Sequence, residues 1–413
     1  MRDWILRNQR TTFLIASGCS TASSFAGLTA KGWILMSETA NPLVLALHFA
    51  ALALPSLLVS GPAGVLTDRL GCERMLIRSQ WGLVAGASLG AIAIPLLSGW
   101  AQVVLLLLST LVVGTSSSFE LTARNKYCAL LVDEPRQLAP YLTSFSVVFN
   151  VGKLVGPPIG GILLALSGPT AALSIDAASY LLPIATVVWL LSPHREAEQR
   201  SAGGRSASLG TAWRECGAPL RHVLVFTGIA CLAVFFHPGL APLIASQVLG
   251  PSPQALGLFT SVLAAGSIGG GLLLQRHSLW LSRRPSLLLG GCTLVTSLAQ
   301  LGMALPASSG FKLMMTFLIG LGTAGLLAGS NLITQVAAPQ VLRGRMAGLG
   351  QIAFLGGGGL SGLAAAALSL RIGLPSTFAL MGSIGLVLAL WELINRPRTL
   401  LLAPEPVAGI RSA

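Results

Sequence analysis

Charged residues are scarce in this sequence. Asp, Glu, Lys and Arg together make up 9% of the 413 residues, whereas hydrophobic residues make up 53%. Soluble proteins carry roughly 25% charged residues, which cover the surface of the folded domain. The scarcity therefore excludes a soluble globular protein and predicts an all-α bundle in a lipid bilayer. The 48 glycines agree with this prediction, because small residues let membrane helices approach one another closely.

Sequence patterns of catalysis are also missing. A Gly-Lys pair occurs only at Gly152-Lys153, without the Ser or Thr and the spacing of a phosphate-binding loop. HExxH, GxSxG and clusters of metal-ligating Cys and His are absent as well. We therefore expect no enzyme activity, no ATP hydrolysis, no cofactor and no metal. Any work that the protein does must then draw on an ion gradient.

Paired cysteines are absent too. None of the six cysteines belongs to a CxxC motif, and most fall in or beside apolar runs, so we interpret them as small buried hydrophobic residues. The first apolar stretch, residues 12–36, is too long for the apolar core of a cleaved signal peptide. We expect it to be an uncleaved first span.

Long apolar runs, in contrast, fill the chain. Each has about 20 residues, enough for a helix to cross a hydrocarbon core of roughly 30 Å. Twelve such spans are predicted, near residues 12–36, 43–66, 75–97, 101–121, 140–166, 170–191, 222–247, 255–275, 285–305, 311–332, 346–369 and 373–395.

Basic residues occur at every second connection between these spans. Arg69, Arg74 and Arg78 follow the second span, for example, whereas the connection at Gly99-Trp100 has none; only Lys312 and Arg371 depart from the pattern. Connections rich in Lys and Arg stay in the cytoplasm. Both termini are therefore predicted to be cytoplasmic. The formal charge of +13 is explained by this distribution, so we expect no nucleic-acid partner.

One long polar linker, residues 192–221, divides the chain into two halves, residues 1–191 and 222–413. The halves echo each other: Gly64-Val-Leu-Thr-Asp68-Arg69 has a counterpart in Gly271-Leu-Leu-Leu-Gln275-Arg276. The sequence therefore predicts two six-helix pseudo-repeats, an arrangement that occurs in transporters.

Three short segments are the most informative. The first is the charged connection from Gly64 to Arg74, with Asp68, Arg69 and Gly71, which must lie in water. The second is the glycine-rich fifth span. The third is Leu342-Arg343-Gly344-Arg345-Met346, at the start of the eleventh span. The residues of interest in the fifth span are Gly152, Gly156, Pro157, Gly160 and Gly161.

These segments resemble motifs of the major facilitator superfamily, in particular its branch of enterobactin-exporter-like, transmembrane secretion effector proteins. Glu120-Leu-Thr-Ala-Arg124 is similar to a further segment of that branch, with Thr122 in place of proline. The resemblance implies the major facilitator fold and a gate. In that gate Asp68 would hold the two halves together by contacting the start of the eleventh span, where Arg343 and Arg345 lie. The departures are Cys72-Glu73, where the family favours basic residues, and Gln275, which replaces the acid.

The glycines of the fifth span allow two interpretations. They place a bare face on one helix, which favours close packing, and a dry seam there would also prevent leakage. Pro157 removes a backbone donor and favours a kink.

Charged residues inside the spans are candidates for substrate or proton binding, because each costs on the order of 3 kcal/mol to insert. They are Lys31, Lys153 and Asp176, with Glu120 and Arg124 at the end of the fourth span. Lys31 could instead snorkel to the interface, and Lys153 could bond to Asn150 or a carbonyl. Asp176 could pair with Lys153 or carry a proton. The lone histidines, His48 and His237, are interpreted as interfacial.

The function that these observations favour is secondary active transport in the cytoplasmic (inner) membrane, by a monomer that binds a small molecule. The resemblance implies proton coupling. Two lysines facing a central cavity would favour export of a small anionic metabolite such as a siderophore. Multidrug efflux of the macrolide type is the alternative. A lipid flippase, a receptor and a structural membrane subunit stay open.

Overall fold

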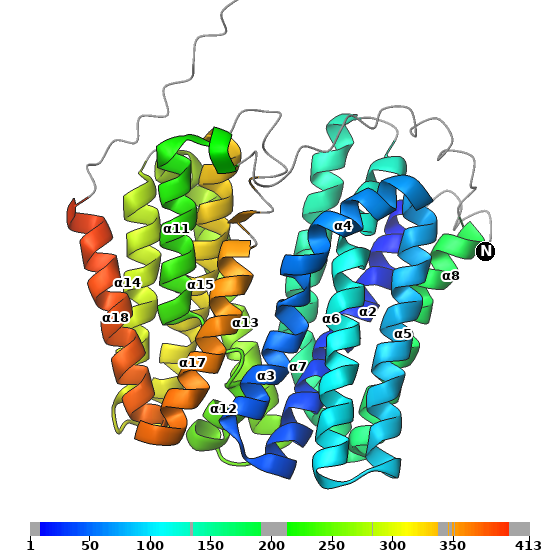
Figure 1. The fold of residues 1–413 in the computed structure, drawn as a ribbon, viewed down its shortest axis with the longest axis horizontal. Helices are drawn as coiled ribbons and strands as arrows, with labels where there is room; N and C mark the ends of the chain where they lie inside the picture. Colours follow the sequence, from blue (N-terminus) through cyan, green and yellow to red (C-terminus); the bar gives the residue numbers. More distant parts are fainter. Residues whose placement is uncertain are drawn as a thin grey trace, which may run out of the picture.

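Helices form nearly all of the backbone in the computed structural model (Figure 1), which describes residues 9–132, 135–190, 213–282, 284–337, 346, 349–350 and 352–395. Those of the first half are α2 (Gln9–Thr39), α3 (Pro42–Ala53), α4 (Pro55–Leu70), α5 (Cys72–Leu96), α6 (Gly99–Leu130), α7 (Pro135–Ser179) and α8 (Leu181–Leu190). Those of the second half are α11 (Gly217–Val234), α12 (Ala241–Leu249), α13 (Pro253–Ser282), α14 (Pro285–Ala304), α15 (Ser309–Ala337), the π-helix η3 (Ile352–Gly356), α17 (Gly357–Ile372) and α18 (Leu374–Asn395).

Twelve crossings of the membrane follow from these helices. In the described part of the chain, eleven segments are long and apolar enough to span it. One of them, Val147–Val188, has 42 residues, about twice what one crossing needs. It leaves the helical region at Gly168 (φ 78°, ψ 172°) and folds back. The two parts of α7, before and after Gly168, therefore contact adjacent residues of α2. Gly160 lies against Ala26, and Asp176 lies against Gly27. Eleven segments, one of them double, make the predicted twelve.

The seventh span differs from the sequence prediction of an unbroken helix over 222–247. α11 begins at Gly217, earlier than predicted, because Arg221 separates Gly217-Ala-Pro-Leu from the apolar run and places it in the predicted linker. It ends at Val234, and α12 begins only at Ala241. Pro238-Gly239 lies between them, and proline cannot donate the backbone hydrogen bond that would continue the helix.

The two halves stand side by side (Figure 1), and among the described residues they share one hydrophobic cluster, at one end of the bundle. The shared cluster includes Leu45 from the first half and Ile244 from the second, and it lies where α2 meets α3 and α12 meets α13. Towards the other end the buried clusters are separate, around Tyr127 in the first half and around Leu326 in the second. The halves therefore seal against each other at one end of the bundle.

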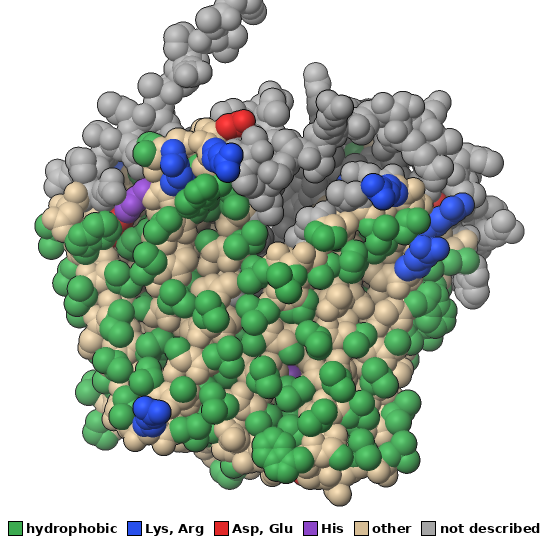
Figure 2. All heavy atoms as spheres, in the orientation of Figure 1, with side chains coloured by type: hydrophobic (Ala, Val, Ile, Leu, Met, Phe, Trp, Pro, Cys, Tyr) green, Lys and Arg blue, Asp and Glu red, His purple; other side chains and the backbone are tan. Residues whose placement is uncertain are grey.

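Charge marks the opposite end. Figure 2 shows Lys and Arg side chains gathered at the upper end, above a broad hydrophobic belt, with a further group near the lower edge. Exposed Arg69, Arg74 and Arg78 lie where α4 meets α5, and Arg276 and Arg284 lie where α13 meets α14. We call this end of the bundle the basic end. At this end the described residues of the two halves form separate buried clusters.

Candidate functional site

Lys31 is buried inside the first half, only 3% exposed, on α2. Its Nζ donates to Ser109 Oγ at 2.8 Å, and Ser109 Oγ donates to the carbonyl of Gly86 at 2.6 Å. The lysine stem passes over Gly90, where an added Cβ would lie 3.0 Å from Lys31 Cε. One ammonium group thus joins α2, α5 and α6. The snorkelling interpretation of Lys31 is wrong, because the side chain turns inward to a hydroxyl.

Asp176 is the negative counterpart, also 3% exposed, on α7. The Tyr180 hydroxyl donates to its carboxylate, and Ser24 Oγ lies 2.9 Å from the Tyr180 oxygen. The carboxylate lies against Gly27, one helical turn before Lys31, and the two opposite charges attract each other. Asp176 Oδ1 has no hydrogen-bond partner among the described residues. The sequence left Lys153 open as the partner, but the structure places Asp176 beside Lys31.

Two histidines that the sequence predicts to be interfacial are buried between helices, His48 near Lys31 and His237 near Lys153. His48 is 6% exposed, and its Nδ1 lies 3.0 Å from Thr110 Oγ1, beside the hydroxyl that holds Lys31. His237 is 2% exposed, in the break between α11 and α12. Both lie within the shared end of the bundle, where span ends of the two halves cover one another. The sequence of one span does not indicate that another span will bury its end.

Lys153 occupies a different environment, at the seam between the halves. It lies on α7 and is only half-buried. The carbonyl of the next residue, Leu154, accepts a hydrogen bond of 2.9 Å from Ser261 Oγ of α13. The Lys153 charge also acts on His237 of the second half. Of the two span lysines, Lys153 alone reaches the surface between the halves.

An aromatic cluster crosses the same seam, and sequence reasoning missed it. Phe235 is the centre of the cluster. Its ring centroid lies 6.3 Å from that of Phe49 on α3, 4.3 Å from that of Phe354 in the π-helix, and 5.3 Å from that of His237. These residues come from three spans and two halves, so no local pattern could predict the cluster. It presents apolar rings where the two halves meet.

Glu120 and Arg124 form a local pair on α6. Glu120 Oε1 and Arg124 Nη1 are 3.3 Å apart, one helical turn from each other, and the guanidinium lies 5.6 Å from the Phe145 ring. The pair lies within the first half, near the basic end. The two opposite charges of this pair neutralise each other. The structure does not bring the pair together with Lys31 and Lys153.

The predicted gate segment is more helical than its sequence suggests. α4 runs to Leu70 and α5 begins at Cys72, so Gly71 is the whole connection. Its φ of 89° is a conformation that glycine adopts most readily. Lys126 Nζ reaches the carbonyl of Gly64 at 3.4 Å, a contact between α6 and α4 that the sequence did not indicate. The side chain of Asp68 lies outside the described residues, as do Arg343 and Arg345. The predicted contact between them stays a prediction.

The glycines of the fifth span lie at close contacts between helices. An added Cβ at Gly152 would meet Thr21 at 2.9 Å, and Cβ atoms at Gly156 and Gly160 would meet the backbone of Ala22 and Ala26 on α2. Gly161 faces the other way, where an added Cβ would lie 2.8 Å from the carbonyl oxygen of Pro253 on α13.

Pro157 lies inside this span, and its carbonyl would be 2.9 Å from a Cβ at Gly257. The backbone of α7 departs from helical angles at Gly168, not at Pro157. The small residues therefore serve two helix contacts, one within the first half and one between the halves.

Comparison with known proteins agrees with this architecture. Residues 6–399 match the transmembrane secretion effector family. The chain is 25% identical over 419 residues to the multidrug efflux pump Tap of Mycolicibacterium fortuitum, covering 95% of this chain and 98% of that protein.

Solved structures share the fold. A variant of the nucleoside transporter NupG aligns with a TM-score of 0.73 at 11% identity, over 93% of this chain and 99% of that one. A POT family transporter in complex with 5-aminolevulinic acid aligns with a TM-score of 0.71 at 12% identity, over 94% and 96%.

Proposed function

Because the chain belongs to the transmembrane secretion effector family of major facilitator transporters, we propose that it is a secondary active exporter. Its substrate would pass between the two halves by alternating access, in which the halves rock about a central site. The observation that supports this mechanism best is the hydrophobic core shared at one end and divided at the other. A bundle sealed at one end only is one of the two states that alternating access requires.

The orientation of the exporter follows from its charges. Lys and Arg side chains gather at the basic end, and membrane proteins retain such connections in the cytoplasm. The described state would then be open to the cytoplasm and sealed towards the outside. An exporter loads its substrate in this state.

The substrate proposed here is an amphipathic organic molecule, as for a multidrug pump. The seam between the halves carries the Phe49, Phe235 and Phe354 rings, and the buried Lys31 is already held by Ser109 and attracted by Asp176. An anion between the halves would therefore meet Lys153 alone, and not two lysines as the sequence predicts. The similarity to a multidrug efflux pump supports the same choice.

A small anionic metabolite such as a siderophore is the second candidate, favoured by half-buried Lys153. Transport by purified protein in liposomes under a proton gradient separates the two candidates. We expect both the wild type and Lys153→Ala to transport an aromatic cation such as ethidium. Lys312→Ala, which removes a lysine from the first turn of α15, is the matched control. If a carboxylate chelator is transported instead, and Lys153→Ala slows it by about tenfold, equivalent to ~1.4 kcal/mol, the second candidate is correct.

Asp68 is proposed as the gate residue that closes the basic end when the cavity faces outward. A carboxylate is stabilised at the N-terminus of a neighbouring helix by the unpaired N–H groups there. Asp68→Asn removes the charge and keeps the shape. We expect the variant to insert normally, by fluorescence of a C-terminal fusion, and to transport several-fold more slowly. Transport at the wild-type rate would disprove the gate.

A further inference from the structure

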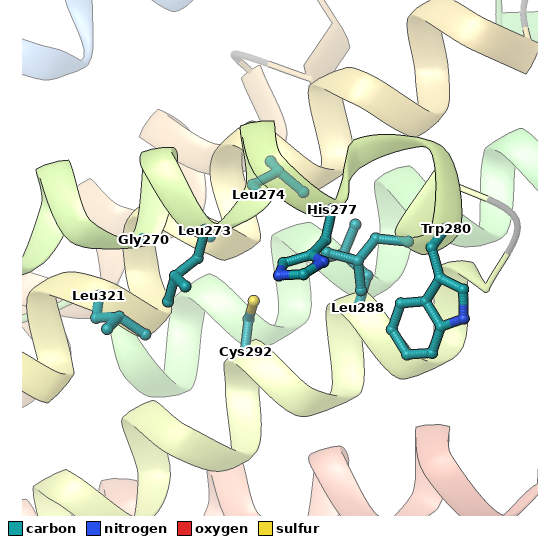
Figure 3. Close-up of a pocket in the computed structure, with 10 residues that line it drawn as sticks. Gly270, Leu273, Leu274, His277, Trp280, Leu288, Cys292 and Leu321 are labelled. Atoms are coloured by element: carbon teal, nitrogen blue, oxygen red, sulfur yellow. The ribbon is translucent and has the colours of Figure 1, made fainter.

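A cavity of about 710 Å³ lies outside the seam between the halves, among α13, α14 and α15 (Figure 3). Its volume falls within the ~300–1,000 Å³ that is typical of ligand pockets. Leu274, Leu288 and Leu321 form apolar walls. Gly270 and Gly325 also line it; an added Cβ at these positions would meet Leu321 and Cys292, so the enclosing helices pack closely there. The cavity is therefore part of the second half alone and is separate from the proposed transport path.

The cavity is open to the bilayer. Leu273 is 51% exposed and Trp280 is 49% exposed, and both line it. α13 leaves regular helical geometry at His277 (φ −112°, ψ 16°), which changes the course of the chain before Trp280. A molecule that enters here comes from the hydrocarbon layer and need not cross water.

Cationic and polar groups stand at the rim, towards the basic end. His277 points into the cavity, with Cys292 opposite (Figure 3). The Arg284 guanidinium lies 4.7 Å above the centroid of the Trp280 ring, and Arg276 is exposed on the adjoining turn of α13. Arginine and tryptophan together are typical of the level at which lipid headgroups lie. The rim thus favours negative charge, whereas the interior favours hydrocarbon.

We propose that this cavity binds an anionic phospholipid from the leaflet at the basic end, with an acyl chain between the leucines and the phosphate at His277 and Arg284. Basic pockets between membrane helices select anionic headgroups. A soluble anion would satisfy the rim and leave the walls empty, and a neutral lipid would do the reverse. Only an anionic lipid matches both parts and can enter from the side.

Native mass spectrometry of the delipidated full-length protein tests the proposal. The probes are phosphatidylglycerol and phosphatidylcholine with identical oleoyl chains. We expect the first bound phosphatidylglycerol to have a roughly tenfold lower Kd than phosphatidylcholine, because both carry a phosphate but the choline ammonium cancels the headgroup charge that would otherwise face Arg284. The double variant His277→Ala, Arg284→Ala should lose this preference, whereas Arg371→Ala, at the other end of the bundle, should keep it.

A second variant tests the cavity itself. Leu273→Trp places a bulky ring in the opening and should prevent binding of either lipid, whereas Leu272→Trp, at an exposed neighbour that does not line the cavity, should not. Equal affinities for the two lipids, or an unchanged preference in the double variant, would overturn the proposal. So would displacement of phosphatidylglycerol by glycerol 1-phosphate, which would identify an anion site. A lipid-free dimer that Leu273→Trp disrupts would identify a protein interface instead.

Discussion

Asp176→Asn is expected to uncouple transport from the proton gradient and to destabilise the protein. The substitution leaves the Lys31 ammonium buried without the nearby opposite charge. Because Lys31 bonds Ser109 and is attracted by Asp176 without a direct salt bridge, we expect a loss below the ~3–5 kcal/mol of breaking a direct buried ion pair. Thermal unfolding of the purified variant measures the loss of stability. Uphill accumulation of substrate in liposomes measures the loss of coupling.

The double variant Lys31→Met, Asp176→Asn separates these two effects. Removing both charges together is often neutral for stability, so the double variant should unfold near the wild-type temperature. Ser109 keeps its bond to the Gly86 carbonyl in this variant. We expect downhill exchange of substrate to persist and uphill accumulation to stay lost. If the double variant accumulates substrate against a gradient, the charge pair serves structure alone, and the coupling site lies elsewhere.

Gly156→Leu should have the largest effect on folding. An added Cβ at this position meets the Ala22 carbonyl oxygen and lies 2.7 Å from Phe25 Cβ, so a leucine forces α7 away from α2. Overpacking usually costs ~1–3 kcal/mol, and backbone atoms on the opposing helix cannot move aside as a side chain can. We expect the monodisperse peak in fluorescence-detected size-exclusion chromatography to disappear.

Gly291→Leu is the matched control for this prediction. It introduces the same residue into a span, but an added Cβ at Gly291 has nothing within 4 Å. That variant should elute and unfold like the wild type. Equal stability of the two variants would mean that the α2–α7 contact adjusts readily, and that the glycines of the fifth span are not required for packing.

Much of the fold could be predicted from local pattern. Span positions follow from hydropathy, and the alternation of basic connections predicts how the chain weaves through the membrane. The spacing of Gly152, Gly156 and Gly160 predicts one bare helix face, and the structure puts that face against α2. The break between α11 and α12 was missed although Pro238 indicated it, because the apolar run continues across it.

The candidate site could be predicted only as a set of charges. Lys31 and Asp176 were identifiable because ionisable residues in a span are costly. Their neighbours Ser109 and Tyr180 were not, since hydroxyls are common in membrane helices. The one available signal was the Ser109-Thr110 pair inside a run of leucines.

The sequence by itself determined that this chain is a twelve-span helical bundle with two related halves and one basic face, because burial in lipid and helix formation depend on neighbours along the chain. Only the tertiary structure decided that Lys31 faces Ser109 and Asp176, that Lys153 alone reaches the seam, and that one end of the bundle is sealed. These facts depend on contacts between residues far apart in sequence. Their distances are set by helix packing, to which every span contributes.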